Sequence, residues 1–262
     1  MRLLPLLVLL SALSARSTAA EESASGDQRA LEVVGPSAPL CHEVKVPTPD
    51  GLTLVADHCP AKEEGAPVAV LLHMIPPHHD RTNYPAAFRQ KLVAAGIEVL
   101  NLDRRGGGDS PGVAKEAYTG PKGIEDVQGA VDWLRANSRA DLSRWACVGA
   151  SNGTTTCLDY AVAAAEVEGR QAPTALVFLT GGGYTENQNA LKGSVVEHLP
   201  VLFTCNAKEK EWSEAQKAYG NADLWRFRSY EPGGHGTKAF GPNPEAMDDV
   251  TGFLKKELGA SP

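Results

Sequence analysis

Beyond its first twenty residues, the 262-residue sequence lacks any apolar run long enough to cross a membrane. It also lacks a basic patch, since 32 acidic residues outnumber 25 lysines and arginines and the formal net charge is −7. A chain this acidic is a poor match for nucleic acid or for an anionic lipid surface. It contains no internal repeat and no low-complexity block. These absences argue against a nucleic-acid-binding protein, an integral membrane protein and a repeat architecture.

The first twenty residues have a pattern of their own. They begin with the basic Arg2, continue with an apolar stretch over residues 3–13 and end in small residues. This pattern is typical of a secretory signal peptide, here cleaved before Glu21. The alternative is an N-terminal membrane anchor, but the apolar stretch is short for a bilayer. Cleavage would remove Arg2, Arg16 and no acid, so the net charge would change from −7 to −9. We therefore expect a secreted or periplasmic protein that has no membrane partner once the signal is removed.

Residues 21–40 are polar and contain glycine and proline, which predicts a flexible arm before a folded domain over residues 41–262. That domain alternates strand-like and helix-like segments. The strand-like segments are an apparent hairpin at residues 41–59 and runs at residues 67–73, 97–103, 144–150, 174–180, 200–205 and 224–230. The helix-like segments are residues 84–96, 123–137, 154–167 and 243–258. A leading hairpin followed by repeated strand–helix units predicts an α/β fold with a mostly parallel sheet and helices on both faces. Ligands bind such sheets at the carboxyl ends of the strands.

One of these strand-to-helix turns carries the segment GASNG, residues 149–153. It matches the pattern G-x-S-x-G, in which the serine occupies a strained bend that presents its hydroxyl to substrate. The position between a strand and a helix is the context that this pattern requires. The sequence therefore predicts Ser151 as a nucleophile.

A serine hydroxyl is a weak nucleophile without a base, and the base needs an orienting carboxylate. His235 follows the last strand in the glycine-rich segment PGGHG and is the candidate base. The carboxylate should follow the strand at residues 200–205, where Glu209 and Glu211 are both candidates. This charged segment could instead be a solvated surface run.

The chain resembles the α/β-hydrolase superfamily, and more narrowly the small secreted bacterial hydrolases of the dienelactone hydrolase-like or prolyl-oligopeptidase-like type. Besides the serine and histidine segments, the resemblance rests on LLHMIPPHHDRTNYP after the third strand, on NLDRRGGGDS and on PVLFTCNAKE. It implies an α/β-hydrolase fold, here with an N-terminal antiparallel hairpin and no large cap domain. In these families the acid lies nine residues past the proline that opens its strand, which implies Glu209 in this chain. The families usually have aspartate there, and Lys208 and Lys210 flank the glutamate of this chain.

An oxyanion hole needs two backbone donors aimed at the developing charge. The resemblance implies the N–H of Asn152 as one of them. Ile75 is the better candidate for the other, followed by Met74, because the prolines after Ile75 have no N–H. The families usually read His-Gly where this chain reads His73-Met74.

A metal site is the alternative interpretation of the histidine-rich segment after the third strand. His73, His78, His79 and Asp80 are all of the residue types that bind metals, but their spacing fits no established site. We therefore expect no metal and no cofactor.

Together these features predict a carboxylesterase-like serine hydrolase that acts on a small-molecule acyl substrate through Ser151, His235 and Glu209. Two alternatives remain open. One is a catalytically weak or inactive binding protein with the same fold, and the other is a serine peptidase for short peptides. The sequence specifies neither the substrate nor an oligomeric state.

The five cysteines leave at least one without an intramolecular partner. If the hairpin turn centres on Asp50, residues whose numbers sum to 100 face each other, and Cys41 then lies opposite Cys59. An exported protein meets an oxidising environment, so we expect these two to form a disulfide. We expect Cys147, Cys157 and Cys205 to remain reduced as small buried hydrophobes.

The signal-peptide prediction has a direct test. Protein exported from its natural host, or from a bacterial host with a Sec pathway, should have a mature N-terminus near Glu21. N-terminal sequencing of the exported protein checks this prediction, and recovery of an intact Met1 in the exported fraction would reject it.

Overall fold

The computed structural model describes residues 40–189, 191, 194–218, 221 and 223–261. The predicted signal peptide (residues 1–20) and the predicted arm (residues 21–40), except for its last residue, lie outside the described residues. In the part of the chain that is described, no helix combines the length and the apolar character needed to span a membrane.

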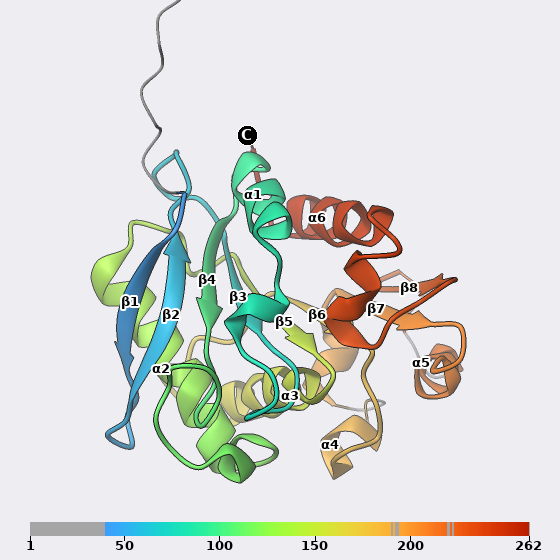
Figure 1. Cartoon of the computed structure of the whole chain (residues 1–262), viewed down its shortest axis with the longest axis horizontal. Helices are drawn as coiled ribbons and strands as arrows, with labels where there is room; N and C mark the ends of the chain where they lie inside the picture. Colours follow the sequence, from blue (N-terminus) through green and yellow to red (C-terminus); the bar gives the residue numbers. More distant parts are fainter. Residues whose placement is uncertain (1–39, 190, 192–193, 219–220, 222, 262) are drawn as a thin grey trace, which may run out of the picture. The chain divides into compact units, whose positions relative to one another are not determined.

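Within the described residues, eight strands form one sheet in the order β1-β2-β4-β3-β5-β6-β7-β8 (Figure 1). The strands are β1 (His42–Pro47), β2 (Thr53–Cys59), β3 (Val68–Leu72), β4 (Glu98–Leu102), β5 (Trp145–Ala150), β6 (Ala175–Leu179), β7 (Val201–Asn206) and β8 (Trp225–Tyr230). Strand β2 runs antiparallel to both of its neighbours, and the strands from β4 to β8 are parallel. This arrangement confirms the predicted α/β-hydrolase fold with its N-terminal hairpin.

Helices cover both faces of the sheet (Figure 1). The helices are α1 (Ala86–Ala94), α2 (Pro121–Asn137), α3 (Asn152–Glu166), α4 (Glu186–Asn189), α5 (Glu211–Lys217) and α6 (Glu245–Glu257). Alternate residues of β3 point to opposite faces, so that Val70 packs with α2 and α3 whereas Leu71 packs with α1 and α6. A strand buried on both faces reads as a continuous apolar run, which is why the parallel strands could be located in the sequence.

In the part of the chain that the structure describes, four short 3-10 helices and the two short α-helices α4 and α5 were not predicted from the sequence. The 3-10 helices are η1 (Arg81–Asn83), η2 (Ala114–Ala117), η3 (Val195–His198) and η4 (Gly236–Phe240). Helix α5 begins within the charged segment that we also read as a solvated run, and its indole Trp212 packs against the core. Elements of this length depend on tertiary packing rather than on a periodic sequence pattern.

The hairpin register agrees with the sequence analysis. Glu43 pairs with Asp57 and Val46 pairs with Leu54, as expected for a turn centred on Asp50. The pair at the open end of the hairpin is His42 with His58. One residue beyond it, Cys41 and Cys59 form a disulfide with their Cα atoms 4.1 Å apart.

A second disulfide joins Cys147 on β5 to Cys157 on α3, with their Cα atoms 5.6 Å apart. The prediction that both of these cysteines are reduced was therefore wrong, and only Cys205 remains a free, buried thiol among the five. The physical reason is the turn at Ser151, which folds α3 back along β5. That turn brings a residue four positions before the serine next to a residue six positions after it.

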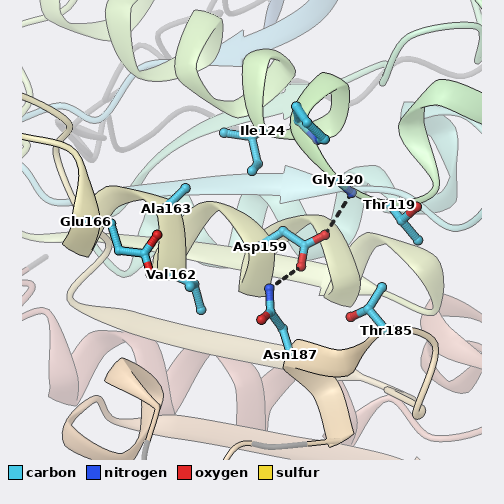
Figure 2. A pocket seen from close by; sticks show the side chains of 10 residues that line it. Thr119, Gly120, Ile124, Asp159, Val162, Ala163, Glu166, Thr185 and Asn187 are labelled. Carbon is cyan, nitrogen blue, oxygen red and sulfur yellow. Dashed lines mark hydrogen bonds between the residues drawn. The ribbon is translucent and has the colours of Figure 1, made fainter.

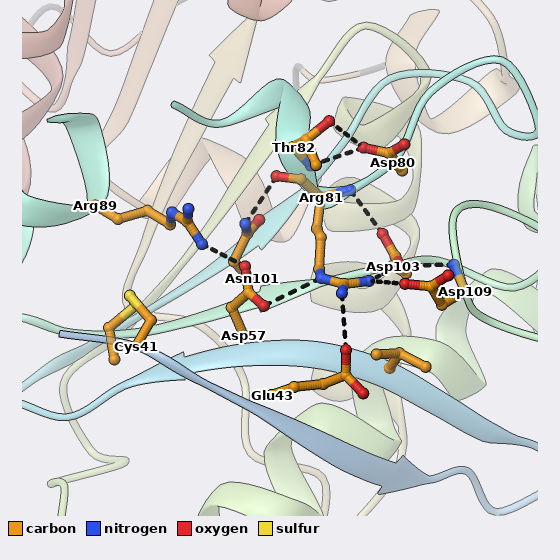
Figure 3. Close-up of polar contacts among 12 residues, drawn as sticks. Cys41, Glu43, Asp57, Asp80, Arg81, Thr82, Arg89, Asn101, Asp103 and Asp109 are labelled. Atoms are coloured by element: carbon orange, nitrogen blue, oxygen red, sulfur yellow. Dashed lines mark hydrogen bonds and ion pairs between the residues drawn. A yellow bond between two sulfur atoms is a disulfide. The ribbon is translucent and has the colours of Figure 1, made fainter. Parts of the chain in front are cut away.

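An ion-pair network anchors the segment that follows β3 (Figure 3). The guanidinium of Arg81 in η1 bonds to the carboxylates of Glu43 on β1, Asp57 on β2, Asp103 directly after β4 and Asp109 in the loop that follows. Burial alone would lower the pKa of Arg81, but these carboxylates raise it above its usual value. The network therefore ties the hairpin to the loop after β3, which carries the candidate oxyanion donor.

The Cys147–Cys157 disulfide closes a loop with a sequence separation of 10 that contains Ser151. We expect the double variant Cys147→Ala/Cys157→Ala to lose ~2.5–3 kcal/mol of unfolding free energy, because the open loop gains conformational entropy in the unfolded chain. Urea denaturation of the oxidised wild type and of the variant measures this difference.

The matched control is Cys205→Ala, which removes a buried thiol without opening a loop. An equal loss in the control and in the double variant would mean that packing, and not the disulfide, is responsible. Peptide mapping without reduction should recover Cys41 linked to Cys59, Cys147 linked to Cys157, and Cys205 alone.

Candidate active site

The candidate nucleophile lies at the carboxyl end of β5, where the chain turns into α3. Ser151 has φ 51° and ψ −121°, a left-handed backbone conformation that is costly for a residue with a side chain. Its N–H donates to the carbonyl of Leu179 on the neighbouring strand at 2.8 Å. Thr154 donates to the Ser151 carbonyl from its N–H at 2.9 Å and from its hydroxyl at 2.6 Å. These bonds maintain the strained turn.

The two glycines of the G-x-S-x-G segment are needed because the backbone packs too closely there for any side chain. A Cβ atom on Gly149 would overlap the carbonyl oxygen of Gly153. A Cβ atom on Gly153 would in turn overlap the carbonyl oxygen of Leu72 at the end of β3. The two glycines of the G-x-S-x-G pattern therefore allow α3 to pack closely against β5 and β3.

The candidate base reaches the serine from the loop after β8. The Nε2 atom of His235 lies 2.6 Å from the Oγ atom of Ser151. On the other side of the ring, Nδ1 lies 3.0 Å and 3.1 Å from the two carboxylate oxygens of Glu209. A carboxylate can only accept at Nδ1, so the ring carries its proton there and Nε2 is left as the acceptor for the serine hydroxyl.

The structure distinguishes between the two candidate acids. Glu209 contacts the imidazole, whereas Glu211 is exposed as the first residue of α5. Both the Glu209 side chain (42% exposed) and the His235 side chain (36% exposed) are open to water. Lys208 and Lys210 do not displace Glu209, because its carboxylate bonds to His235 and to Asn206.

Asn206, the last residue of β7, shapes the turn that presents Glu209. Its side-chain oxygen accepts from the N–H groups of Lys208 at 2.8 Å and Glu209 at 3.1 Å, and its amide donates to the Glu209 carboxylate. The sequence analysis missed this residue. An asparagine directly after a strand, with its side chain capping the next two or three N–H groups, is the signal that could have identified it.

Thr180 supports the histidine loop from β6. Its hydroxyl accepts from the N–H of Gly236, next to His235, at 3.0 Å. Thr180 also has a positive φ of 56°, and its own N–H donates to the Thr204 carbonyl at 2.7 Å. No pattern in the sequence marked this residue, because its role depends on the spacing of β6 and the loop after β8.

The candidate oxyanion donors come from two segments that meet beside Ser151. Asn152 is the first residue of α3, so its N–H has no acceptor within the helix. Met74 is buried and Ile75 is half-buried in the loop after β3. Asn152 directly follows Ser151, and the loop that carries Met74 and Ile75 is joined to Asn152 through Arg104.

The buried guanidinium of Arg104, directly after β4, joins these two segments. It donates to the carbonyls of His73 at 3.2 Å and Met74 at 3.4 Å, and to the Asn152 side chain at 3.0 Å. It also donates to Thr156 on α3 at 2.7 Å. Burial lowers the pKa of Arg104 to about 10, which still leaves the side chain protonated at neutral pH.

The hydrogen bonds of His73 argue against its being a metal ligand. Its Nδ1 donates to the carbonyl of Met74 at 2.7 Å, and its Nε2 accepts from the N–H of Arg104 at 2.9 Å. Both ring nitrogens are therefore occupied, and burial together with the Arg104 charge lowers the pKa of His73 to about 3. Across the described ranges, no three His, Cys, Asp or Glu side chains are grouped as a metal ion requires.

The segment after β6 lies along α3 and reaches the nucleophile. The buried side chain of Gln188 donates to the Thr154 hydroxyl at 2.8 Å and accepts from the N–H of Tyr184 at 3.1 Å. Burial raises the pKa of Tyr184, and a hydrogen bond with Ser151 offsets part of this rise. Tyr184 is nevertheless 48% exposed, so one wall of the site is an aromatic side chain open to solvent.

Several solved structures share this fold at low sequence identity. An esterase of Pyrococcus furiosus, Pf2001, has 17% identity and a TM-score of 0.62 over 82% of this chain and 92% of its own. The esterase Est22 has 15% identity and a TM-score of 0.61 over 82% of this chain and 81% of its own. EstE1, a thermostable carboxylesterase from a metagenomic library, has 16% identity and a TM-score of 0.62 over 83% of this chain and 89% of its own. A comparison with curated proteins gave no significant match.

A sequence model of the family described as X-Pro dipeptidyl-peptidase (S15 family) matches residues 50–235. This range is well over half of the 262 residues and contains Ser151, Glu209 and His235. The chain therefore belongs to the S15 family within the α/β-hydrolase superfamily.

Proposed function

We propose that this protein is an exported serine hydrolase that cleaves a carboxylic ester, or a similar acyl bond, of a small molecule. The observation that carries the proposal is the 2.6 Å contact between the Ser151 hydroxyl and Nε2 of His235. A nucleophile within hydrogen-bond reach of a base that is itself oriented by a third group is the arrangement that acyl transfer requires. The reaction needs no cofactor.

In the proposed mechanism, His235 removes the hydroxyl proton as Ser151 attacks the substrate carbonyl carbon. Glu209 keeps the proton of the neutral ring on Nδ1 and stabilises the imidazolium that forms. The N–H groups of Asn152 and Ile75 then stabilise the oxyanion. His235 gives its proton to the leaving group, and the same base activates the water that hydrolyses the acyl-enzyme.

The solvent exposure of Glu209 determines how much its charge contributes to the proposed catalysis. Glu209 and His235 are each more than a third exposed, so water screens their interaction. Loss of the Glu209 charge should therefore cost less than loss of the acid in a fully buried triad. The segment after β6 is short and carries no separate cap domain, which supports a small or varied substrate rather than a large enclosed one.

A peptidase acting on short peptides is the second candidate, and the description of the matched family favours it. The three solved structures named above favour the ester instead, since their names describe esterases. Both candidates use the same three residues, so only the substrate distinguishes them.

We expect kcat/KM for p-nitrophenyl acetate and butyrate to exceed kcat/KM for an X-Pro p-nitroanilide. The reason is that an activated ester requires only the Ser151–His235 pair, whereas an X-Pro substrate also needs a site for its N-terminal ammonium group. Parallel assays of both substrate classes with the same preparation measure the ratio. A higher kcat/KM for the X-Pro p-nitroanilide than for the esters would contradict the esterase proposal and favour the peptidase.

The triad assignment predicts a graded series. Ser151→Ala and His235→Ala should each lower hydrolysis of short p-nitrophenyl esters by about 10³-fold or more. Glu209→Gln should cost less than the ~10⁴-fold typical of a buried triad acid. A fluorophosphonate probe, which labels an activated serine whatever its substrate, should modify the wild type and not Ser151→Ala.

Glu211→Gln is the matched control, because it makes the same change two residues away without touching His235. It should leave activity within about twofold of wild type. A larger effect at Glu211 than at Glu209 would show that the acid is misassigned. A wild type that neither turns over esters nor reacts with the probe would favour the inactive binding protein.

A further inference from the structure

A pocket of about 480 Å³ lies beside the middle of α3, away from Ser151 (Figure 2). Its walls come from the start of α2, from α3 and from the segment after β6. Such a volume is in the range of small-molecule binding sites. None of the ten residues that line the pocket takes part in the proposed hydrolysis.

The polar centre of this pocket is a buried carboxylate. Asp159 is only 6% exposed, and its two oxygens accept from the N–H of Gly120 at 3.1 Å and from the Asn187 amide at 2.8 Å. Figure 2 shows Asp159 between these two donors. Both donors are neutral, and no lysine, arginine or histidine is among the described residues that line the pocket. A buried charge without a counter-ion is costly, so a cation entering the pocket would find an unusually favourable partner.

The rest of the lining has the chemistry that accommodates an organic cation. Glu166 adds a second carboxylate at the exposed side, two helical turns along α3 from Asp159. Ile124, Val162 and Ala163 provide apolar surface for the carbon atoms of a ligand. Thr185 contributes a buried hydroxyl oxygen that has no hydrogen-bond partner.

The segments that line the pocket also bond to residues close to Ser151. On one side, Asn187 bonds to Asp159 while the next residue, Gln188, bonds to Thr154 near the serine. On the other side, Thr119 and Gly120 directly follow Tyr118, whose carbonyl accepts from the Asn152 amide at 2.8 Å. Helix α3 rises 1.5 Å per residue, so the eight residues from Ser151 to Asp159 correspond to about 12 Å.

We propose that this pocket binds the cationic end of the substrate, an ammonium group separated from the acyl carbon by on the order of 12 Å, the axial distance along α3 between Ser151 and Asp159. The assignment to a substrate rests on the proposed function, whereas the binding of an organic cation does not. A substrate held at both ends would gain specificity from a site that is otherwise open to water.

A purely structural role for Asp159 makes different predictions. Gly120 is the N-terminal cap of α2, and a carboxylate at a helix N-terminus stabilises the helix. Asp159→Asn keeps an oxygen for the Gly120 N–H but removes the charge. If Asp159 only caps α2, this variant should change stability and leave ligand binding unaffected.

The first test uses Ser151→Ala protein, which cannot turn over a ligand, and titrates it with n-hexylammonium and with n-hexanol. Calorimetry or NMR should give a Kd for the cation at least tenfold below that for the alcohol. Asp159→Asn in the same background should abolish this difference. Asp223→Asn, an exposed aspartate outside the pocket, is the matched control and should leave it unchanged.

Val162→Lys is a second variant, which keeps the proposal testable if Asp159→Asn misfolds. The lysine would lie one helical turn from Asp159 and supply an internal cation, so it should abolish ammonium binding while keeping the carboxylate. Equal affinity for the alcohol and the cation in the parent protein, or ammonium binding that survives both changes, would overturn the proposal.

The second test asks whether the bound cation belongs to the substrate. The wild type should hydrolyse a ten-carbon ω-amino acyl p-nitrophenyl ester with a kcat/KM at least tenfold above that for the ten-carbon ester ending in a methyl group. Asp159→Asn should remove the preference and leave kcat/KM for the methyl-ended ester unchanged. Equal rates for the two esters in the wild type would overturn the substrate assignment. No hydrolysis of either ester would count against the proposed function itself, and the titration would still decide whether the pocket binds cations.

Discussion

The hydrogen bonds of Arg104 are the interaction on which the candidate site depends. One buried guanidinium joins the loop after β3 to the first turns of α3, and these are the segments that carry the candidate oxyanion donors. A buried charge is tolerated only where most of its donors have partners, and here carbonyl and side-chain oxygens accept from both terminal nitrogens of the guanidinium, while its Nε has no partner among the described residues. Because Asn152 follows Ser151 directly, the same guanidinium also restrains the turn that carries Ser151, the proposed nucleophile. Replacement by lysine would keep the charge but lose the fork of donors that reaches both segments.

Around this centre, each member of the site is held by a residue that does not itself react. Asn206 shapes the turn that presents Glu209, and Thr180 supports the loop that carries His235. The glycines on either side of the serine let α3 approach β5 and β3 closely enough for the strained turn to form. The Cys147–Cys157 disulfide then crosses the same turn covalently. Such support keeps reacting groups within hydrogen-bond reach even where the imidazole and the carboxylate are open to water.

The distribution of charge suggests how an open site can still be selective. The acidic chain has a carboxylate buried among neutral donors beside α3, and another at the exposed side of the same pocket. A carboxylate gives little selectivity at an exposed position, where water screens it, and more where the carboxylate itself is buried, as Asp159 is. Selectivity in this protein would then come from the distal end of a ligand rather than from the contacts next to the reacting carbon.

The sequence by itself determined the strands, the hairpin register and the nucleophile turn, because each is encoded by neighbouring residues. Continuous apolar runs mark strands buried on both faces, a turn centred on Asp50 sets the pairing of Cys41 with Cys59, and G-x-S-x-G marks the bend at Ser151. The family resemblance implied Glu209 rather than Glu211, and the tertiary structure brings its carboxylate to His235. Only the tertiary structure decided the second disulfide and the roles of Arg104 and Asn206. These depend on distances between segments that the chain order does not reveal. A strand and a helix that turn back on each other bring Cys147 to Cys157, and loops after separate strands meet only when the sheet has formed.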